Sequence, residues 1–296
     1  MDKVLTLIGP SNNDISWNAN KYVVNFLNKL CGPVNEFCLA KKEAYDIYFS
    51  GPECGYVEEL VRAELSGEKI DFATQLVANR RKKLLLADMD STIIATETLD
   101  ELAEFAGLKD EISRITAKAM NGELPFKAAI QERVAMLKGL DEDAIRVLLT
   151  NIQYSPGAEV LIKTMNALGV YTALVSGGLR QMTKCVKENL GFKFEIGNEL
   201  GIDSGKLNGN IVGKIVTASV KRDILINLAL REGLNLKETM AVGDGFNDLP
   251  MLQNAGMGVA YHAKPKVVKA ARFRLDHKGL DGLLFFQGIT RAQFIE

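Results

Sequence analysis

The chain has 296 residues, 47% of them hydrophobic and 25% charged, and its formal net charge at pH 7 is -1. This composition is typical of a globular protein with one large or two moderate domains. The nearly balanced charge argues against nucleic acid or an anionic membrane as a partner, so a site for an anion has to be built locally.

The cysteines and the N-terminus indicate the compartment. The 4 cysteines form no C-x-x-C pair and only 2 histidines are present, which argues against a structural zinc site. The first residues lack the apolar run and cleavage site of a signal peptide, and no stretch approaches about eighteen uninterrupted apolar residues. We therefore expect a cytoplasmic protein whose reduced cysteines are small buried side chains.

Residues 1–80 predict a small α+β domain without a catalytic residue set. Helices are indicated where apolar residues recur every three or four positions, and strands where short apolar segments end at Gly or Pro. The predicted elements are strands at Lys3–Gly9 and Ala44–Ser50, helices at Trp17–Leu30 and Val57–Leu65, and an extended segment at Ile70–Val77.

We place the second domain at residues 81–296. A basic run, Arg80-Arg81-Lys82-Lys83, lies across the boundary between the two domains. An anion-binding patch is one interpretation of such a run. A solvated linker or the entrance to a strand is the more common one, and we expect it here.

From Leu84 onward, apolar runs end in small or acidic residues and alternate with helical segments. Continuous apolar runs are typical of strands buried on both faces of a parallel sheet, so the pattern predicts a doubly wound α/β core. Ligands bind at the carboxyl ends of such strands. The three main strands are Leu84–Asp88, Val170–Gly178 and Thr239–Asp244, the helices between them include Gly157–Gly169 and Lys221–Gly233, and shorter strands are expected at Met257–Tyr261 and Arg272–Leu275.

About 60 residues, roughly 94–153, lie between the first two strands and are patterned as helices. This segment is too long for a simple crossover. We expect an inserted helical cap over the end of the sheet, with helices at Glu97–Gly107, Asp110–Gly122, Phe126–Gly139 and Asp141–Ile152.

The motif Asp88-Met89-Asp90-Ser91-Thr92 is the first that carries chemistry. Side chains alternate along an extended strand, so Asp88 and Asp90 point the same way. Two close carboxylates repel unless a cation or a proton lies between them, which suits Mg²⁺ at Asp88 and a proton on Asp90. The pair then supplies a nucleophile and an acid/base, whereas the alternative is a pair of helix N-cap residues.

Two further strand ends add to this motif. Asp244 and Asp248 lie in a glycine-containing loop, where Asp244 would be a further metal carboxylate and Asp248 would hold a metal-bound water or orient a neighbour. Ser176-Gly177-Gly178 offers a hydroxyl and backbone amides to a phosphate, although a tight turn explains it equally well. Lys221 supplies a point charge for phosphate, or is a solvated residue at a helix start. P-loop and G-x-S-x-G motifs are absent.

Together, D-M-D-S-T, S-G-G, a downstream Lys and Gly243–Met251 resemble the haloacid dehalogenase superfamily of aspartyl-phosphate phosphatases, over roughly residues 84–276. This resemblance implies a Rossmann-like core, a helical cap and Mg²⁺ as the cofactor. The cap segments Ile115–Met120 and Glu132–Gly139, with Glu97 in T-E-T-L-D-E-L-A, are similar to those of its phosphoserine phosphatases.

The resemblance also implies a role for each matching position. Asp88 matches the nucleophile and a metal ligand, and Asp90 the acid/base whose backbone carbonyl is on the metal. Asp244 matches the remaining carboxylate ligand. The positions that match substrate-binding residues are Ser176, Gly177, Lys221 and Asn247 for the phosphate, Glu97 and Arg133 for the ammonium and the carboxylate, and Met120 and Phe126 for the apolar wall of the cap.

The implied activity is hydrolysis of O-phosphoserine to serine and phosphate, the last step of serine biosynthesis, on a small phosphorylated amino acid. A related small-metabolite phosphatase or phosphotransferase, or an amino-acid-sensing regulatory protein, stays open. Residues 1–80 resemble ACT-like domains by pattern, which is compatible with a homodimer through that domain. One departure is Arg180, where related sequences have a small residue, so that this side chain faces either the crevice or solvent.

Overall fold

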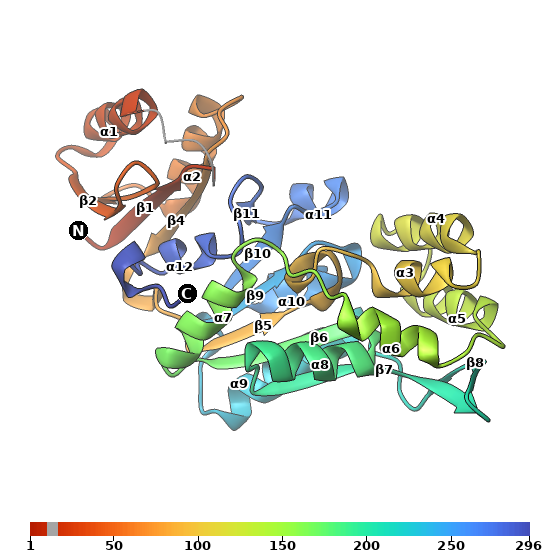
Figure 1. Cartoon of the computed structure of the whole chain (residues 1–296). Helices are drawn as coiled ribbons and strands as arrows, with labels where there is room; N and C mark the ends of the chain where they lie inside the picture. The colour runs from red at the N-terminus through yellow and green to blue at the C-terminus, as the bar shows by residue number, and fades with distance from the viewer. Residues whose placement is uncertain (11–16) are drawn as a thin grey trace.

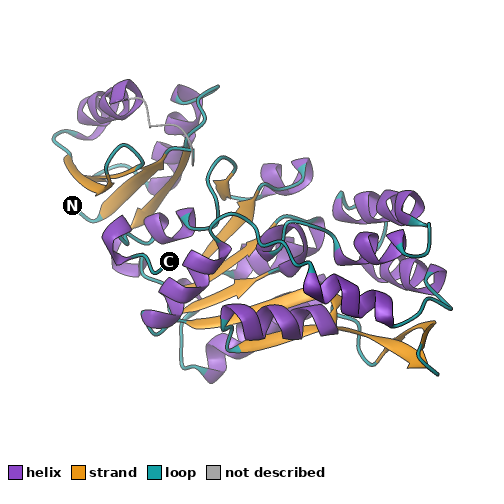
Figure 2. Cartoon of the chain, viewed as in Figure 1, coloured by secondary structure: helices purple, strands orange, loops and turns teal. Residues whose placement is uncertain are grey.

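The computed structural model describes residues 1–10 and 17–296. It contains a four-stranded sheet built from the N-terminal residues, a seven-stranded sheet, and a group of helices beyond one end of the larger sheet (Figures 1 and 2). Among the described residues, no helix has both the length and the apolar character needed to cross a membrane.

The N-terminal sheet is antiparallel, with strand order β2-β3-β1-β4. Its β-α-β-β-α-β order is that of a ferredoxin-like unit. Buried apolar residues such as Leu5, Phe49 and Val57 form a core of their own. The elements are β1 (Lys3–Ile8), α1 (Trp17–Cys31), β2 (Asn35–Ala40), β3 (Ala44–Phe49), α2 (Cys54–Glu64) and β4 (Asp71–Leu76).

Strand β2 is absent from the sequence prediction. Four of its six residues are exposed, so this edge strand has no alternation of apolar and polar residues to indicate it. The prediction that the cysteines are buried is wrong for three of them: only Cys54 is buried, whereas Cys38 is exposed and Cys31 and Cys185 are partly exposed.

The large sheet has the order β11-β10-β9-β5-β6-β7-β8 and confirms the predicted α/β core. All neighbouring strands are parallel except β7 and β8, which form an antiparallel hairpin. The strands are β5 (Leu84–Ala87), β6 (Tyr171–Leu179), β7 (Phe194–Asp203), β8 (Lys206–Val212), β9 (Thr239–Gly243), β10 (Met257–Tyr261) and β11 (Phe273–Leu275).

Helices cover both faces of this sheet (Figure 2). Leu85 and Ala87 of β5 pack into one apolar cluster and Leu84 and Leu86 into another, so every residue of the strand is buried. This is the physical reason for its uninterrupted apolar run. The surrounding helices are α7 (Ala158–Ala167), α8 (Arg180–Leu190) and α12 (Gly282–Phe286) in the first cluster, and α9 (Ala218–Arg231), α10 (Leu249–Asn254) and α11 (Pro265–Ala270) in the second.

The four predicted cap helices lie between β5 and α7 in the chain (Figure 1). The β7–β8 hairpin, which was not predicted, holds their base: the backbone N–H of Gly139 donates to the carbonyl of Leu207, and that of Leu207 to Leu140. The hairpin is rich in glycine and largely half-exposed, so its sequence lacks a strand pattern. The helices are α3 (Thr98–Glu104), α4 (Lys109–Met120), α5 (Phe126–Met136) and α6 (Asp143–Thr150).

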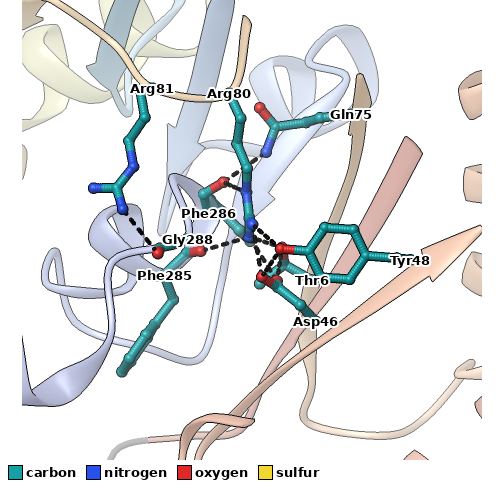
Figure 3. Close-up of polar contacts among 9 residues, drawn as sticks. All are labelled: Thr6, Asp46, Tyr48, Gln75, Arg80, Arg81, Phe285, Phe286 and Gly288. Carbon is teal, nitrogen blue, oxygen red and sulfur yellow. Dashed lines mark hydrogen bonds and ion pairs between the residues drawn. The ribbon is translucent and has the colours of Figure 1, made fainter. Parts of the chain in front are cut away.

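The basic run is the entrance to a strand, as expected, because β5 begins directly after it. The alternative of a solvated linker is wrong for Arg80 and Lys82, which are both buried. The Arg80 guanidinium donates to both carboxylate oxygens of Asp46, at 2.5 and 2.6 Å, and to the hydroxyl of Thr6. It also donates to the backbone carbonyls of Phe285 and Phe286 (Figure 3). One side chain therefore joins the N-terminal sheet to the C-terminal helix of the large unit.

We predict that Asp46→Asn lowers the free energy of unfolding by about 3 kcal/mol, because it leaves the buried Arg80 charge without its partner. Chemical denaturation followed by circular dichroism measures this change. Asp143→Asn is the matched control, since its ion pair with Arg146 is exposed and contributes less than about 1 kcal/mol. Equal losses in the two variants would contradict a structural role for the Arg80–Asp46 pair.

Candidate active site

The carboxyl ends of β5, β6 and β9 meet at one edge of the large sheet, because β5 pairs with both of its neighbours in parallel. Asp88 follows β5, Ser176 lies near the end of β6, and Asp244 follows β9. The predicted convergence of these strand ends is confirmed. They form a small chamber with the cap helices, lined by Asp88, Asp90, Glu97, Thr98, Leu99, Met120, Phe126, Arg133, Ser176, Gly177, Gly178 and Asn247.

Asp88 and Asp90 both line this chamber. The backbone is extended at each of them (ψ 159° and 134°) and left-handed at Ser91 (φ 55°). One carboxylate oxygen of Asp90 accepts hydrogen bonds from the backbone N–H and the hydroxyl of Thr98, at 2.9 and 2.6 Å. The other accepts from Ser176 at 2.7 Å. Three donors thus orient Asp90, and one of them is the first amide of α3, so the helix-capping interpretation holds in part.

Lys221 is fully buried and lies between two carboxylates. Its Nζ is 2.6 Å from Oδ1 of Asp88 and 2.7 Å from Oδ1 of Asp248. Burial by itself would lower the pKa of this ammonium, but Asp248 and Asp88 outweigh burial and raise it. The helix begins at Ala218, earlier than predicted, so Lys221 lies inside its first turn instead of at a solvated start.

Asp88, Asp244 and Asp248 form an acidic cluster in which one carboxylate oxygen of each lies within 4.8 Å of the others. Burial, followed by repulsion from Asp248, raises the pKa of Asp244 to about 7. The same two causes raise the pKa of Asp88 well above its ordinary value. Thr92 donates to Oδ1 of Asp244, whereas Oδ2 is buried without a hydrogen-bond partner among the described residues.

This cluster fits a divalent metal ion. Three buried carboxylates, of which Lys221 contacts two and Lys264 acts on Asp244 from farther away, leave excess negative charge. The oxygen of Asp244 without a partner among the described residues is the type of hard ligand that Mg²⁺ prefers. The side-chain cluster contains Asp248, which had been assigned outside the ligand set, and does not contain the side chain of Asp90. The backbone amide of Gly245 also donates to Asp248, so this residue is fixed from two sides.

The glycines after Ser176 are needed for close approach. A Cβ atom on Gly177 would lie 2.3 Å from the ring of Phe126, and one on Gly178 would lie 2.4 Å from a carboxylate oxygen of Asp90. Both contacts are far shorter than van der Waals distance. The Ser-Gly-Gly sequence is therefore more than a tight turn. Its two glycines let the end of β6 contact Phe126 of the cap and the carboxylate of Asp90.

Glu97 and Arg133 reach the chamber from the cap side. Ser91 donates to the Glu97 carboxylate at 2.8 Å, and burial, then repulsion from Asp90, raises the pKa of Glu97 to about 8. Arg133 on α5 is buried and donates to the hydroxyl of Thr116 at 2.8 Å. Burial lowers the pKa of Arg133, against the attraction of Glu97.

Sequence reasoning missed several residues that shape the site. Thr98 holds Asp90, Thr92 holds Asp244, and Thr116 links Arg133 to Asp100, at 2.6 Å from its carboxylate. Thr92 belongs to the first acidic motif, Asp88-Met89-Asp90-Ser91-Thr92, so its position in the sequence indicates a place near the site. The contacts of Thr98 and Thr116 follow no local sequence pattern, because Asp90, Asp100 and Arg133 belong to other elements of the structure. Arg180 pairs with Glu199 at an exposed position and does not line the chamber.

A family model of haloacid dehalogenase-like hydrolases matches residues 85–253. The chain is 38% identical over 261 residues to the phosphoserine phosphatase of Streptomyces coelicolor, covering 87% of this chain and 64% of that protein. It therefore spans less than two thirds of that relative's length. It is 42% identical over 205 residues to the phosphoserine phosphatase of Lactococcus lactis, covering 69% of this chain and 95% of the relative.

Two solved structures are similar over most of their length. A HAD-family hydrolase from Salmonella enterica serovar Typhi has a TM-score of 0.83 and 28% identity, with 96% of this chain and 97% of that chain covered. A phospho-aspartyl intermediate analogue of phosphoserine phosphatase has a TM-score of 0.67 and 37% identity, with 70% of this chain and 99% of that chain covered.

We predict that a divalent cation binds this cluster and that its affinity decreases below about pH 7. Asp244 has a raised pKa of about 7, so below that pH the cation must displace a proton, and binding weakens by about tenfold per pH unit. Isothermal titration with Mg²⁺ at pH 8, 7 and 6 measures the slope. Asp244→Asn should abolish binding and Asp143→Asn should preserve it; a pH-independent affinity would contradict the prediction.

Proposed function

Because the chain belongs to the haloacid dehalogenase-like hydrolases, in the family of the phosphoserine phosphatases, we propose that it hydrolyses O-phosphoserine to serine and phosphate through an aspartyl-phosphate on Asp88. One observation carries this proposal. The chamber that contains Asp88 also contains a carboxylate, Glu97, and a guanidinium, Arg133, from the opposite side.

The charges of phosphoserine match this chamber one by one. The dianionic phosphate suits the strand ends, where the Lys221 ammonium contacts Asp88 and where Ser176 and Gly177 line the chamber. The substrate carboxylate suits the Arg133 fork, and the substrate ammonium suits Glu97. An ammonium beside Glu97 would also stabilise its ionised form, which burial disfavours in the empty chamber.

In the first step, a carboxylate oxygen of Asp88 attacks phosphorus in line, and the bond from phosphorus to the serine oxygen breaks. Asp90 gives its proton to that leaving oxygen, which releases serine and leaves phosphate on Asp88. The three hydrogen bonds to Asp90 hold its carboxyl group in one orientation for this transfer. General acid catalysis of this kind contributes about 10²–10⁴ in rate.

In the second step, Asp90 takes a proton from a water molecule, and the resulting hydroxide attacks phosphorus of the aspartyl-phosphate. The bond to Asp88 breaks, so phosphate leaves and both carboxyl groups return to their starting states. Lys221 offsets negative charge on the phosphoryl group throughout, and such electrostatic positioning is the main source of catalysis in phosphoryl transfer.

Mg²⁺ is the cofactor that we propose for the acidic cluster. Asp88 and Asp244 would hold it, with the backbone carbonyl of Asp90 as the expected further ligand and Asp248 beside it. When bound, it supplies positive charge to the phosphoryl oxygens and relieves the repulsion among the carboxylates. Asn247 lines the chamber and is buried, as expected of a residue beside the phosphate.

The chamber is small, with a volume of about 20 Å³, which is room for one or two water molecules. Phosphoserine is larger, so the cap has to move away from the sheet for substrate to enter. Phe126, packed over Gly177, and Met120 form the apolar wall that separates in this motion. A cytoplasmic location and a homodimer through residues 1–80 stay predictions from the sequence.

Asp88→Asn is expected to abolish phosphoserine hydrolysis, because the amide is not a nucleophile for phosphorus. Phosphate release with Mg²⁺ measures activity, and the circular dichroism spectrum checks the fold. The exposed residue Asp143 provides the control, with Asp143→Asn fully active. Substantial turnover by pure Asp88→Asn protein would overturn the nucleophile assignment.

Arg133→Ala is expected to raise KM for phosphoserine by about tenfold or more, since a charge-assisted hydrogen bond to the substrate carboxylate is lost. Hydrolysis of p-nitrophenyl phosphate, which has no carboxylate, should change far less. Arg114→Ala on the neighbouring helix α4 is the control, because Arg114 is exposed. Equal losses on both substrates would contradict the role of Arg133.

A further inference from the structure

A second cavity, of about 340 Å³, lies between the N-terminal sheet and the large sheet. The beginning of α2, the strand β4 and the connection that enters β5 supply one part of its wall. Lys237 and Arg272 of the large unit supply another part. No residue of the proposed catalytic chamber lines it, so its chemistry can be considered separately.

Lys82 is the most unusual residue of this cavity, because it is a buried cation with 5% of its surface exposed. Its ammonium donates to the backbone carbonyls of Asn79 and Lys237, each at 2.8 Å. Within the described part of the chain, no carboxylate lies within ion-pair distance of it. Burial lowers the pKa of Lys82 to about 8, against the attraction of Glu238. Two carbonyls and this more distant carboxylate therefore compensate the buried charge only in part.

Two more donors face the same space. Arg272, another lining residue, has a half-exposed side chain that donates to the carbonyl of Thr74 at 3.1 Å and pairs with Glu58. Helix α2, which has 11 residues, begins at Cys54, and the preceding Glu53 makes no side-chain capping bond. Glu53, Cys54 and Gly55 line the cavity, so the N-terminus of α2, with its unpaired first-turn amides and the positive end of the helix dipole, lies at the cavity wall.

Thr74 provides an independent observation. Its side chain is completely buried, it lines the cavity, and its hydroxyl has no hydrogen-bond partner among the described residues. Buried hydroxyl groups are normally hydrogen-bonded. Among the cavity-lining residues, three cations, Lys82, Lys237 and Arg272, face one carboxylate, that of Glu53. The balance is the opposite of that in the acidic cluster.

We propose that this cavity is a binding site for a small oxyanion, a carboxylate or a tetrahedral anion such as phosphate. The anion would pair with Lys82 and Arg272 and accept hydrogen bonds from the Thr74 hydroxyl and the first amides of α2. Because these groups come from both sheets, a bound anion links the N-terminal unit to the large one. The proposal does not depend on the reaction at Asp88.

The test uses the full chain in matched buffers of constant ionic strength, with sodium chloride replaced by sodium sulfate or sodium acetate. The melting temperature is measured for the native chain, Lys82→Gln and Arg272→Gln. Lys29→Gln, a change at an exposed lysine of α1, is the control. Sulfate bound at the catalytic chamber shifts all four proteins equally, so only differences between them report on the second cavity.

We expect sulfate, acetate or both to raise the melting temperature of the native chain and of Lys29→Gln. The shift should be smaller in Lys82→Gln and Arg272→Gln, with affinity lost by about tenfold. The responding salt identifies the class of anion. Equal shifts in all four proteins, or no shift in the native chain, would overturn the proposal. If Lys82→Gln fails to fold, Arg272→Gln decides, because that side chain is half-exposed.

Crystals soaked in sodium selenate give a second, direct readout. Anomalous scattering from selenium is expected in the cavity beside Lys82 and Thr74, in addition to any signal at the catalytic chamber. Selenate at the catalytic chamber alone would overturn the proposal for a tetrahedral anion and leave acetate as the deciding arm of the melting experiment.

Discussion

The ammonium of Lys221 is the interaction on which the site depends. Three buried carboxylates, Asp88, Asp244 and Asp248, lie within a few ångströms of one another, and like charges at this distance destabilise the folded chain unless a cation is near. Lys221 contacts two of them directly. The third, Asp244, keeps a buried oxygen without a partner. The site therefore carries an electrostatic imbalance that a divalent metal ion would correct.

The residues that line the chamber come from two parts of the fold, the strand ends of the large sheet and the cap helices. The strand ends supply the groups for phosphorus chemistry, and the helices supply Glu97 and Arg133 for the remainder of the substrate. A chain of hydrogen bonds from Arg133 through Thr116 to Asp100 ties together helices α5, α4 and α3. These hydrogen bonds fix the guanidinium of Arg133 relative to the other cap helices.

The N-terminal sheet is connected to the same machinery through the chain itself. The segment with Arg80 and Lys82 leads directly into β5, the strand that ends before Asp88. Arg80 donates hydrogen bonds to both units, as Figure 3 shows. Lys82 lines a cavity and donates to two backbone carbonyls, and among the described residues no carboxylate lies within ion-pair distance of it. One basic run thus contains a permanent structural link and a candidate anion-binding group two residues apart.

The sequence by itself determined the α/β core, the cap helices and the order of the chemical residues. These features follow from local patterns: apolar runs for buried strands, helical periodicity for the cap, and short acidic motifs at strand ends. Only the tertiary structure decided which groups share a contact. It placed Asp248 in the acidic cluster, buried Arg80 and Lys82, and added β2 and the β7–β8 hairpin, because long-range pairing and burial depend on partners far along the chain.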